Sequence, residues 1–351
     1  MSEPLTVAVV GLRGMGMAHA KAFAACPEFR VVAGCDLDPA RTAELAAAVP
    51  GVAVFADYTR MLADIRPAVV VVATGTASHA ALSLAAVEAG ARGIFCEKPM
   101  AVSLGDARAM VAACRARGCA LVVNHQRRTQ GPYLAMRRLM EAGAIGTVEL
   151  IRASCPGDLL SDGTHAIDSI RHLAGDAPVR WVFGQVCRDR PDPAEPRGAG
   201  YDVSGGWRYG HPIETGAFAV LGFASGLRAE LFTGSLHLKG RQYQDFEVLG
   251  TAGRLWRAGD AAGNTVLIQD GSAGGFRPVA DVEPTDPGFI CARFARMIRD
   301  GAPHPLNGDS ALADHELVTA VHESARLRAR VELPLAQDRY PLELMIEAGA
   351  L

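Results

Sequence analysis

The 351-residue chain is predicted to have an α/β fold of two domains. Residues 1–124 alternate apolar strands with helical patterns, which predicts a domain of the Rossmann type with a doubly wound parallel sheet. Over residues 125–351 strand-like runs follow one another with few helices between them, which predicts an α+β domain on a large, mostly antiparallel sheet. The length supports two domains, and 49% apolar residues suffice for a core in each.

The composition and the residue pattern exclude several classes of function. A net charge of −3 gives no electrostatic case for binding nucleic acid, and no stretch is long and uncharged enough to span a membrane. The first apolar strand begins near residue 6, so we expect no signal peptide. The 8 cysteines include no C-x-x-C pair and the 10 histidines are dispersed, so we expect a cytoplasmic protein without a bound metal.

The first strand runs into a glycine-rich turn in residues 6–16, TVAVVGLRGMG. Gly11 allows the tight turn, and Gly16 lets the following helix, about 14–26, pack close to the strand. The amino end of that helix is suited to bind a pyrophosphate. Arg13 stands where the G-x-G-x-x-G pattern has its middle glycine. Its side chain must therefore point away from the turn, or its guanidinium must meet a phosphate.

The second strand, about 31–35, ends at Asp36, which lies 20 residues beyond Gly16. At that spacing a carboxylate accepts hydrogen bonds from an adenosine ribose. It would repel the 2′-phosphate of NADP, so we expect NAD as the cofactor and NADP as the less favoured one. Arg41 is close to Asp36 in the sequence, and its positive charge would favour NADP instead. The alternative is that Asp36 is an ordinary turn residue before Asp38 and Pro39.

The remaining elements of the first domain continue the alternation. Strands are expected at about 52–55, 68–73, 93–96 and 121–123, and helices at about 40–49, 77–89 and 103–117. Ligands of such sheets bind beyond the carboxyl ends of the strands. The candidate cofactor contacts are Gly11, Arg13, Gly14, Met15, Gly16, Asp36, Arg41, Thr74, Gly75, His79, Glu97, Lys98, Asn124 and Gln126.

In the second domain the strand-like runs predominate. Strands are expected at about 147–153, 179–186, 216–223, 227–232, 246–249 and 265–269, and helices at about 133–142, 165–173, 289–299 and 310–328. Residues 188–211 are rich in proline, glycine and charge, and they are predicted to form a long functional loop.

A charged pair, Glu97 and Lys98, follows directly on the apolar strand at 93–96. Pro99 favours an extended conformation at Lys98, which would direct its side chain out of the sheet edge. A lysine beside a bound nicotinamide can polarise a substrate hydroxyl group and lower its pKa. The alternative is a salt bridge between Lys98 and a neighbouring acid.

His165 begins a predicted helix, and imidazole has a pKa suited to a general base near neutral pH. Asp168, three residues on, falls on the same helical face and could orient the ring. A histidine in a helix is more often structural than catalytic, and that alternative stays open from these residues alone.

The segments VGLRGMG, CDLDPAR, FCEKPMA, NHQRRTQGPY, EAGAIG and DGTHAIDSIRHLAG occur in this order, and FARMIRDGAPHPLNGDSA and ESARLRARVELPL follow near the end. Together they resemble the Gfo/Idh/MocA family of NAD(P)-dependent oxidoreductases, which act mainly on sugars and cyclitols. The resemblance covers nearly the whole chain. The segments most specific to the family are EKP at residues 97–99 and H-x-x-D at residues 165–168.

The resemblance implies that Lys98 is the catalytic lysine and His165 the catalytic histidine. Many members also carry an aspartate four residues before the histidine, where this chain has Ser161. Asp162 stands one residue later. Either Asp162 is the third catalytic residue despite the shift, or the site relies on Lys98 and His165.

The expected function is that of a dehydrogenase that transfers a hydride between a CH–OH group of a sugar, sugar acid or cyclitol and NAD. One alternative is an NAD-dependent glycosidase that oxidises C3 transiently to permit elimination. Another is a non-catalytic regulatory protein that kept the nucleotide fold. Because the family commonly associates through the large sheet, we expect a homodimer or homotetramer.

Overall fold

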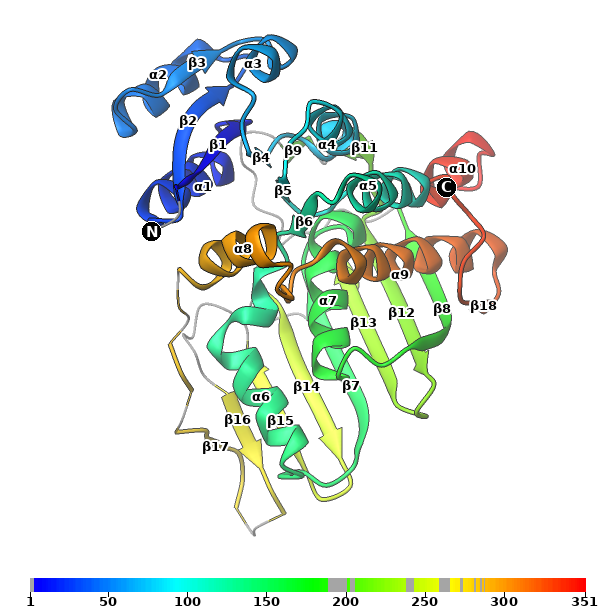
Figure 1. The fold of residues 1–351 in the computed structure, drawn as a ribbon. Coiled ribbons are helices and arrows are strands. Elements are labelled where there is room, and N and C mark those ends of the chain that lie inside the picture. The colour runs from blue at the N-terminus through cyan, green and yellow to red at the C-terminus, as the bar shows by residue number, and fades with distance from the viewer. Residues whose placement is uncertain are drawn as a thin grey trace. The chain divides into compact units, whose positions relative to one another are not determined.

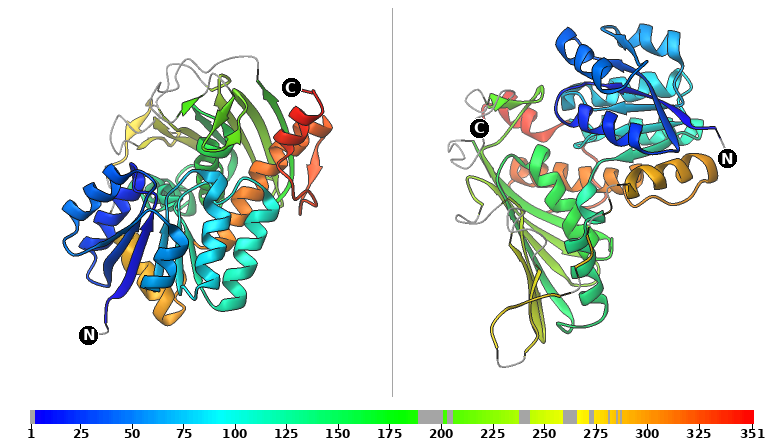
Figure 2. Two further views of the ribbon diagram at one scale, coloured as in Figure 1. Left: turned by 90° about the horizontal axis from the view of Figure 1, so that it is seen from above. Right: turned by 90° about the vertical axis from the view of Figure 1, so that its left-hand side faces the viewer.

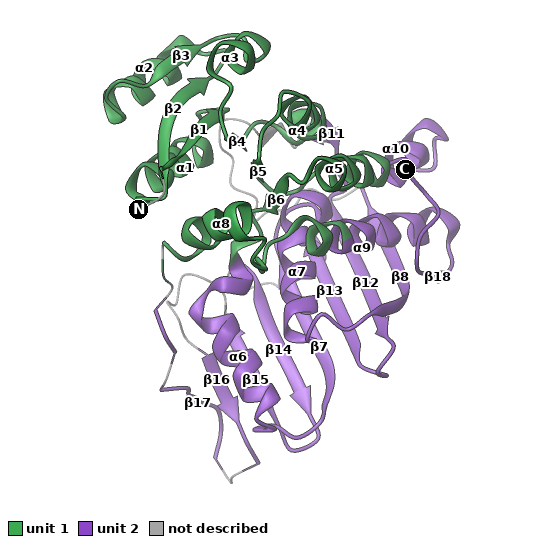
Figure 3. Cartoon of the chain, in the orientation of Figure 1, with its two compact units in different colours: residues 1–126, 286–312 green, residues 127–285, 313–351 purple. Residues whose placement is uncertain are grey.

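The structure is a computed structural model. It describes residues 3–188, 201–202, 206–237, 243–258, 266–271, 274–280, 282–284, 286 and 288–351. The chain divides into two compact units, coloured separately in Figure 3. Unit 1 comprises residues 1–126 and 286–312, and unit 2 comprises residues 127–285 and 313–351. From the sequence we expected residues 286–312 in the second domain, whereas they belong to the first compact unit.

Unit 1 is built on a parallel sheet of six strands in the order β3-β2-β1-β4-β5-β6. Its strands are β1 Leu5–Val10, β2 Phe29–Cys35, β3 Ala53–Phe55, β4 Val69–Val72, β5 Gly93–Cys96 and β6 Ala120–Val123. The predicted doubly wound sheet is therefore confirmed. The strand order reverses between β1 and β4, which places the expected ligand site beyond the carboxyl ends of these two strands.

The helices of unit 1 are α1 Met15–Ala25, α2 Pro39–Ala48, α3 Tyr58–Ile65, α4 His79–Glu88, α5 Leu104–Arg117 and α8 Phe289–Asp300. Two apolar clusters lie on the two faces of the sheet. Val70 and Val72 of β4 join the cluster with α4 and α5, and Val69 and Val71 join the cluster with α1 and α8. All four valines are fully buried, which explains why β4 is an uninterrupted apolar run.

Helix α8 belongs to unit 1 because it completes one of these clusters. Its Phe294 is fully buried and lies 5.9 Å from the Phe95 ring of β5, centroid to centroid. It also lies 6.4 Å from the Phe23 ring of α1. The late segment 286–312 therefore supplies part of the first unit's core.

Unit 2 contains a sheet of nine strands in the order β17-β16-β15-β14-β7-β13-β12-β8-β18, in which only β7 and β13 pair in parallel. Its strands are β7 Val148–Cys155, β8 Val179–Cys187, β12 Gly216–Phe223, β13 Arg228–Gly234, β14 Asp245–Gly250, β15 Gly253–Ala258, β16 Val266–Gln269, β17 Arg277–Pro278 and β18 Val331–Glu332. The prediction of a large, mostly antiparallel sheet is thus confirmed.

Helices lie on one face of this sheet, as the views in Figures 1 and 2 show. They are α6 Gly131–Glu141, α7 Thr164–Leu173 and the unit 2 part of α9 Gly308–Leu327. A short α10, Pro341–Glu347, follows β18. On the helix side of β7, Ile151 and Ala153 are fully buried, whereas Arg152 between them is only partly buried. Among the described residues, no helix is both long and apolar enough to cross a membrane.

Two parts of unit 2 differ from the sequence-based expectation. The predicted loop at 188–211 contains the short strands β9 Tyr201–Asp202 and β10 Trp207–Arg208, and β11 His211–Pro212 continues from it to complete a three-stranded sheet. Residues 189–200 and 203–205 of that loop lie outside the described residues. A π-helical turn, η3 Leu159–Gly163, directly precedes α7.

Candidate active site

The glycine-rich turn joins β1 to α1 and requires glycine at two positions. Gly11 has a φ of 80°, and a Cβ there would lie 2.6 Å from the Ala73 carbonyl oxygen. A Cβ at Gly16 would overlap the Gly11 carbonyl oxygen. The side chains of Arg13 and Met15 are exposed. This close-packed turn at the amino end of α1 fits a pyrophosphate group.

Asp36 is fixed beside that turn by two backbone amides. Its Oδ2 accepts a hydrogen bond of 2.7 Å from the Leu12 amide, and its Oδ1 accepts one of 2.9 Å from the Asp38 amide. Each carboxylate oxygen keeps a lone pair that a ribose hydroxyl can use. Arg41 instead donates to Glu44 at 3.1 Å. The neighbouring Leu37, which the sequence pattern did not single out, is 88% exposed.

Glu97 lies at the centre of a buried hydrogen-bond network at the carboxyl end of β5. Its Oε1 lies 2.6 Å from His19 Nε2 and accepts a bond of 2.8 Å from Nδ2 of the Asn124 side chain. Its Oε2 accepts a bond of 3.2 Å from the Lys98 backbone amide. Burial alone would raise the pKa of Glu97, but the contacts with His19, Asn124 and Lys98 lower it to about 2. Glu97 is therefore ionised at neutral pH and links α1, β5 and β6.

Lys98 is only partly buried, unlike Glu97 before it and Pro99 after it. Its backbone is tied to Glu97, so the network around that carboxylate sets the position from which the lysine side chain extends. His19, the residue of α1 that contacts Glu97, was not among the residues expected from the sequence. A lone histidine 78 residues from its partner gives no local pattern.

His79 is 1% exposed and joins two loops of unit 1. Its Nδ1 lies 2.8 Å from the Pro99 carbonyl oxygen, and its Nε2 lies 3.1 Å from the Thr74 carbonyl oxygen. The buried ring of His79 therefore fixes the two loops that carry Thr74, Gly75 and Lys98. Gln126 is partly buried on the short turn η2 Gln126–Thr129.

In unit 2, His165 is the second residue of α7 and is 4% exposed. The preceding turn η3 carries Ser161, which is fully buried, and Asp162, which is 8% exposed. Asp158 caps this turn, because its Oδ1 accepts a bond of 2.7 Å from the Ser161 amide. Its carbonyl oxygen also accepts bonds from the Asp162 and Gly163 amides, at 3.0 and 3.1 Å.

The carboxylate of Asp162 is held by two side chains from distant segments. Arg208 Nη1 donates to its Oδ2 at 2.6 Å and to Asp158 Oδ2 at 2.7 Å. The Tyr243 hydroxyl donates to its Oδ1 at 2.7 Å. Burial and the charge of Asp162 raise the pKa of Tyr243, so this hydroxyl keeps its proton. Arg208 and Tyr243 thereby orient Asp162 and keep η3 in place.

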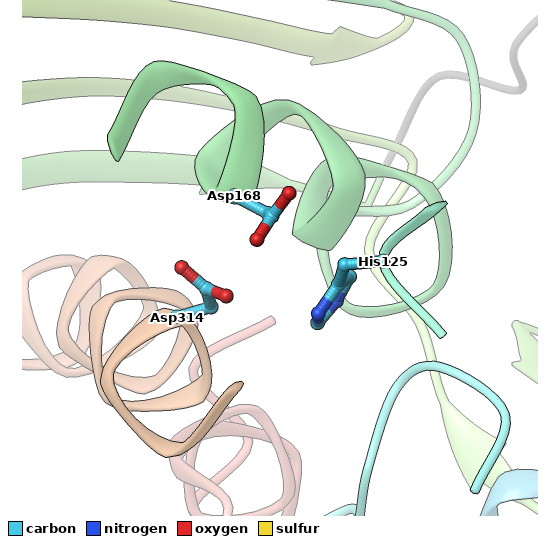
Figure 4. A group of neighbouring side chains, drawn as sticks. All are labelled: His125, Asp168 and Asp314. Carbon is cyan, nitrogen blue, oxygen red and sulfur yellow. The ribbon is translucent and has the colours of Figure 1, made fainter. Parts of the chain in front are cut away.

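Asp168 contacts arginine rather than the His165 ring in the hydrogen bonds of the structure. Its Oδ1 accepts a bond of 2.7 Å from Arg128 Nε. Figure 4 shows its carboxylate turned toward that of Asp314 on α9, which pairs with Arg171 at 2.6 Å. Burial and the nearby charge of Asp314 raise the pKa of Asp168. Any support of His165 by Asp168 would therefore have to act through the position of α7.

Known proteins match the chain over both units. Residues 5–125 match the oxidoreductase family with an NAD-binding Rossmann fold, and residues 133–256 match the GFO/IDH/MocA C-terminal domain. D-apiose dehydrogenase of Paraburkholderia graminis is 32% identical over 189 residues, which are 52% of this chain and 50% of that protein. Levoglucosan dehydrogenase of Pseudarthrobacter phenanthrenivorans is 28% identical over 290 residues, 72% of this chain and 73% of that protein. The chain spans about half the length of several curated relatives that it matches.

Solved structures share the fold over nearly the whole chain. An oxidoreductase from Agrobacterium radiobacter in complex with NAD+, L-tartaric acid and magnesium has a TM-score of 0.75 at 22% identity, covering 94% of this chain and 98% of that one. Levoglucosan dehydrogenase in complex with NADH has a TM-score of 0.76 at 23% identity, covering 95% of this chain and 100% of that one. With both domain matches in the expected order, the chain belongs to the Gfo/Idh/MocA family of oxidoreductases.

Proposed function

We propose that the protein is an NAD-dependent dehydrogenase that oxidises a CH–OH group of a sugar, sugar acid or cyclitol. The observation that carries this proposal is the position of Lys98. It follows the fixed, ionised Glu97 at the carboxyl end of a Rossmann strand, and its backbone amide is bound to that carboxylate. The relatives named dehydrogenases support the same class of reaction.

The residues of unit 1 fit a dinucleotide. The turn from Gly11 to Gly16 would hold the pyrophosphate, Asp36 would bind the ribose hydroxyls, and Leu37 would pack against the adenine. The loops at Thr74–Gly75 and Glu97–Lys98 would line the nicotinamide end. Bound NAD would supply the hydride acceptor.

The protein's side chains would handle the proton and the developing charge. His165 would take the proton of the substrate hydroxyl group as general base. Lys98 would stabilise the alkoxide as it forms. Asp162 would act as an orienting group, because its two oxygens already accept bonds from Arg208 and Tyr243.

The direct test is to add NAD and a panel of sugars, sugar acids and cyclitols and to follow NADH absorbance. Stoichiometric NADH formation supports the dehydrogenase. Cleavage of a nitrophenyl glycoside that depends on NAD but accumulates no NADH would identify the glycosidase instead. Binding of NAD without turnover of any compound would favour the regulatory alternative.

Asp36 is proposed to make the enzyme prefer NAD. We expect the Kd for NADP to exceed that for NAD by at least about tenfold, because the carboxylate would repel a 2′-phosphate. Asp36→Asn should narrow the difference, since an amide oxygen can still accept the Leu12 bond but carries no charge. Asp38→Asn, an exposed change two residues away, is the control. Equal or tighter NADP binding by the wild type would contradict the proposal and point to Arg41 or Arg13.

We also propose that the protein self-associates through the face of the large sheet opposite its helices. This face carries the side chains of Phe183, Phe218 and Phe232, and Phe183 is 36% exposed. Phe183→Glu should lower the mass measured by light scattering, because a charge would be buried in the interface. Val54→Glu in unit 1, also at an exposed apolar residue, should not. A wild-type monomer at all concentrations would refute this proposal.

The eight cysteines of the sequence are all described, and none forms a disulfide in the structure. Seven of them are buried. We propose on this basis that the protein works in a reducing compartment such as the cytoplasm. Mass spectrometry of alkylated protein from its natural host would test the redox state of these thiols.

A further inference from the structure

Unit 2 contains a carboxylate and an imidazole that are both completely removed from solvent. Glu214 lies just before β12, and His322 lies on α9. Glu214 Oε2 and His322 Nε2 are 3.0 Å apart, and both side chains are 0% exposed. A buried pair of this kind contributes little net stability, because the cost of removing both polar groups from water offsets their attraction. The contacts of the pair therefore indicate its role better than its own contribution to stability does.

The other oxygen of Glu214 contacts the turn that leads to His165. Glu214 Oε1 accepts a hydrogen bond of 2.5 Å from the Leu159 amide, the first residue of η3. The first amides of a helical turn lack partners within the turn and need external acceptors. Asp158 serves the Ser161 amide, and Glu214 serves Leu159. A π-helical turn is uncommon and often marks a functional position, so its external contacts matter.

His322 is held in one orientation from both sides. Its Nδ1 lies 3.1 Å from the Val318 carbonyl oxygen, which can only accept, so Nδ1 carries a proton. The ring of Tyr340 packs edge-on against it at 5.1 Å, centroid to centroid. Burial alone would raise the pKa of Glu214, but the bonds from His322 and the Leu159 amide lower it. Glu214 is therefore a rigid, charged acceptor beneath η3.

We propose that Glu214, supported by His322, is a positioning residue that sets the placement of η3 and thereby of Asp162 and His165. The inference rests on the proposed function for its effect on turnover, but its structural part can be measured without activity. Glu214 does not reach the substrate in this scheme. It acts through the backbone of Leu159, and Asp158 and Arg208 complete the support of the same turn.

Glu214→Ala is the principal variant. We expect faster hydrogen exchange in the peptide that covers residues 156–164, because the Leu159 amide loses its acceptor. With a substrate in hand, kcat should fall roughly 10- to 100-fold, the effect of a misplaced catalytic group. The pH profile of kcat should move, and the Kd for NAD should stay within about twofold because the cofactor residues lie in unit 1.

Glu214→Gln tests whether the hydrogen bond to the Leu159 amide or the negative charge of Glu214 positions η3. A glutamine oxygen can accept the Leu159 bond, and its amide can donate to a neutral His322 ring whose Nδ1 keeps the Val318 bond. This variant should therefore recover most of the lost exchange protection and most of the lost kcat. Thr319→Val is the matched control, because Thr319 is a buried α9 residue whose hydroxyl group donates to the His315 carbonyl oxygen of the same helix. It should lower the melting temperature without changing exchange at 156–164.

If Glu214→Ala does not fold, His322→Ala provides a second test of the positioning role. It removes the support of Glu214 but leaves the Leu159 bond, so exchange at 156–164 should rise by less than in Glu214→Ala. Unchanged exchange in every folded variant, or unchanged kcat and pH profile in Glu214→Ala, would overturn the positioning role. If the wild type oxidises no polyol while exchange rises as expected, the proposed function fails and the positioning of η3 stands.

Discussion

Replacement of Lys98 or His165 by alanine is expected to lower kcat by roughly 10²-fold or more. Lys98 would stabilise the developing alkoxide and His165 would take the proton. Both changes should therefore raise the free energy of the transition state and leave the binding of NAD unaffected. The Kd for NAD should therefore remain nearly unchanged, because the proposed pyrophosphate and ribose contacts are at the glycine turn and at Asp36. Steady-state kinetics and fluorescence titration with NAD measure the two quantities separately.

The double variant should lose much less than the product of the single losses, because the two groups serve one proton transfer. Lys21→Ala, at an exposed lysine of α1, is the matched control and should keep full turnover. Asp162→Asn added to the series decides the third position. A loss as large as that of His165→Ala would make Asp162 catalytic, and little change would leave a lysine–histidine site. Near-normal turnover by Lys98→Ala would end the mechanistic assignment.

Gly16→Ala is expected to impair cofactor binding strongly, although it adds only one methyl group. The new Cβ would overlap the Gly11 carbonyl oxygen, so the turn and α1 have to separate. Overpacking of this kind costs roughly 1–3 kcal/mol of folding stability. The displaced turn should raise the Kd for NAD at least about tenfold. Denaturant unfolding and NAD titration give the two values.

Gly118→Ala is the appropriate comparison for that variant. Gly118 ends α5 with a φ of 62°, and a Cβ there would meet nothing within 4 Å. The left-handed conformation should cost about 1 kcal/mol, with no effect on the Kd for NAD. Equal losses of NAD affinity in the two variants would show that the close packing at Gly16 does not govern cofactor binding.

The first unit was predictable from the sequence because its signals are local. Each strand is a short apolar run, and the glycine turn and Asp36 follow their strands directly. Helix α8 was expected in the second domain but belongs to unit 1, because the contacts that place it are not local. Its place depends on contacts of Phe294 with Phe95 and Phe23, which lie 199 and 271 residues earlier in the sequence. Amphipathic periodicity predicts a helix but does not say which sheet it covers.

The candidate site shows the same division. Lys98, His165 and Asp162 could be named because they stand in short motifs. Arg208 and Glu214 could not, although both hold the turn that carries Asp162. Their partners lie 46 and 55 residues away, and each is a single charged residue without a surrounding pattern. The π-helical turn η3 was likewise not predicted, and the side chains of Arg208 and Glu214 that contact it come from distant positions in the sequence.

The return of residues 286–312 to unit 1 limits how the protein can be divided. A fragment that stops after β6 would leave Phe95 and Phe23 without the Phe294 ring that covers them. A gene-fusion or domain-exchange experiment that treats residues 1–126 as a portable module would thus transplant an incomplete core. A module that keeps α8 needs both chain segments joined by a new linker, so a gene in which a linker replaces residues 127–285 is the natural starting design.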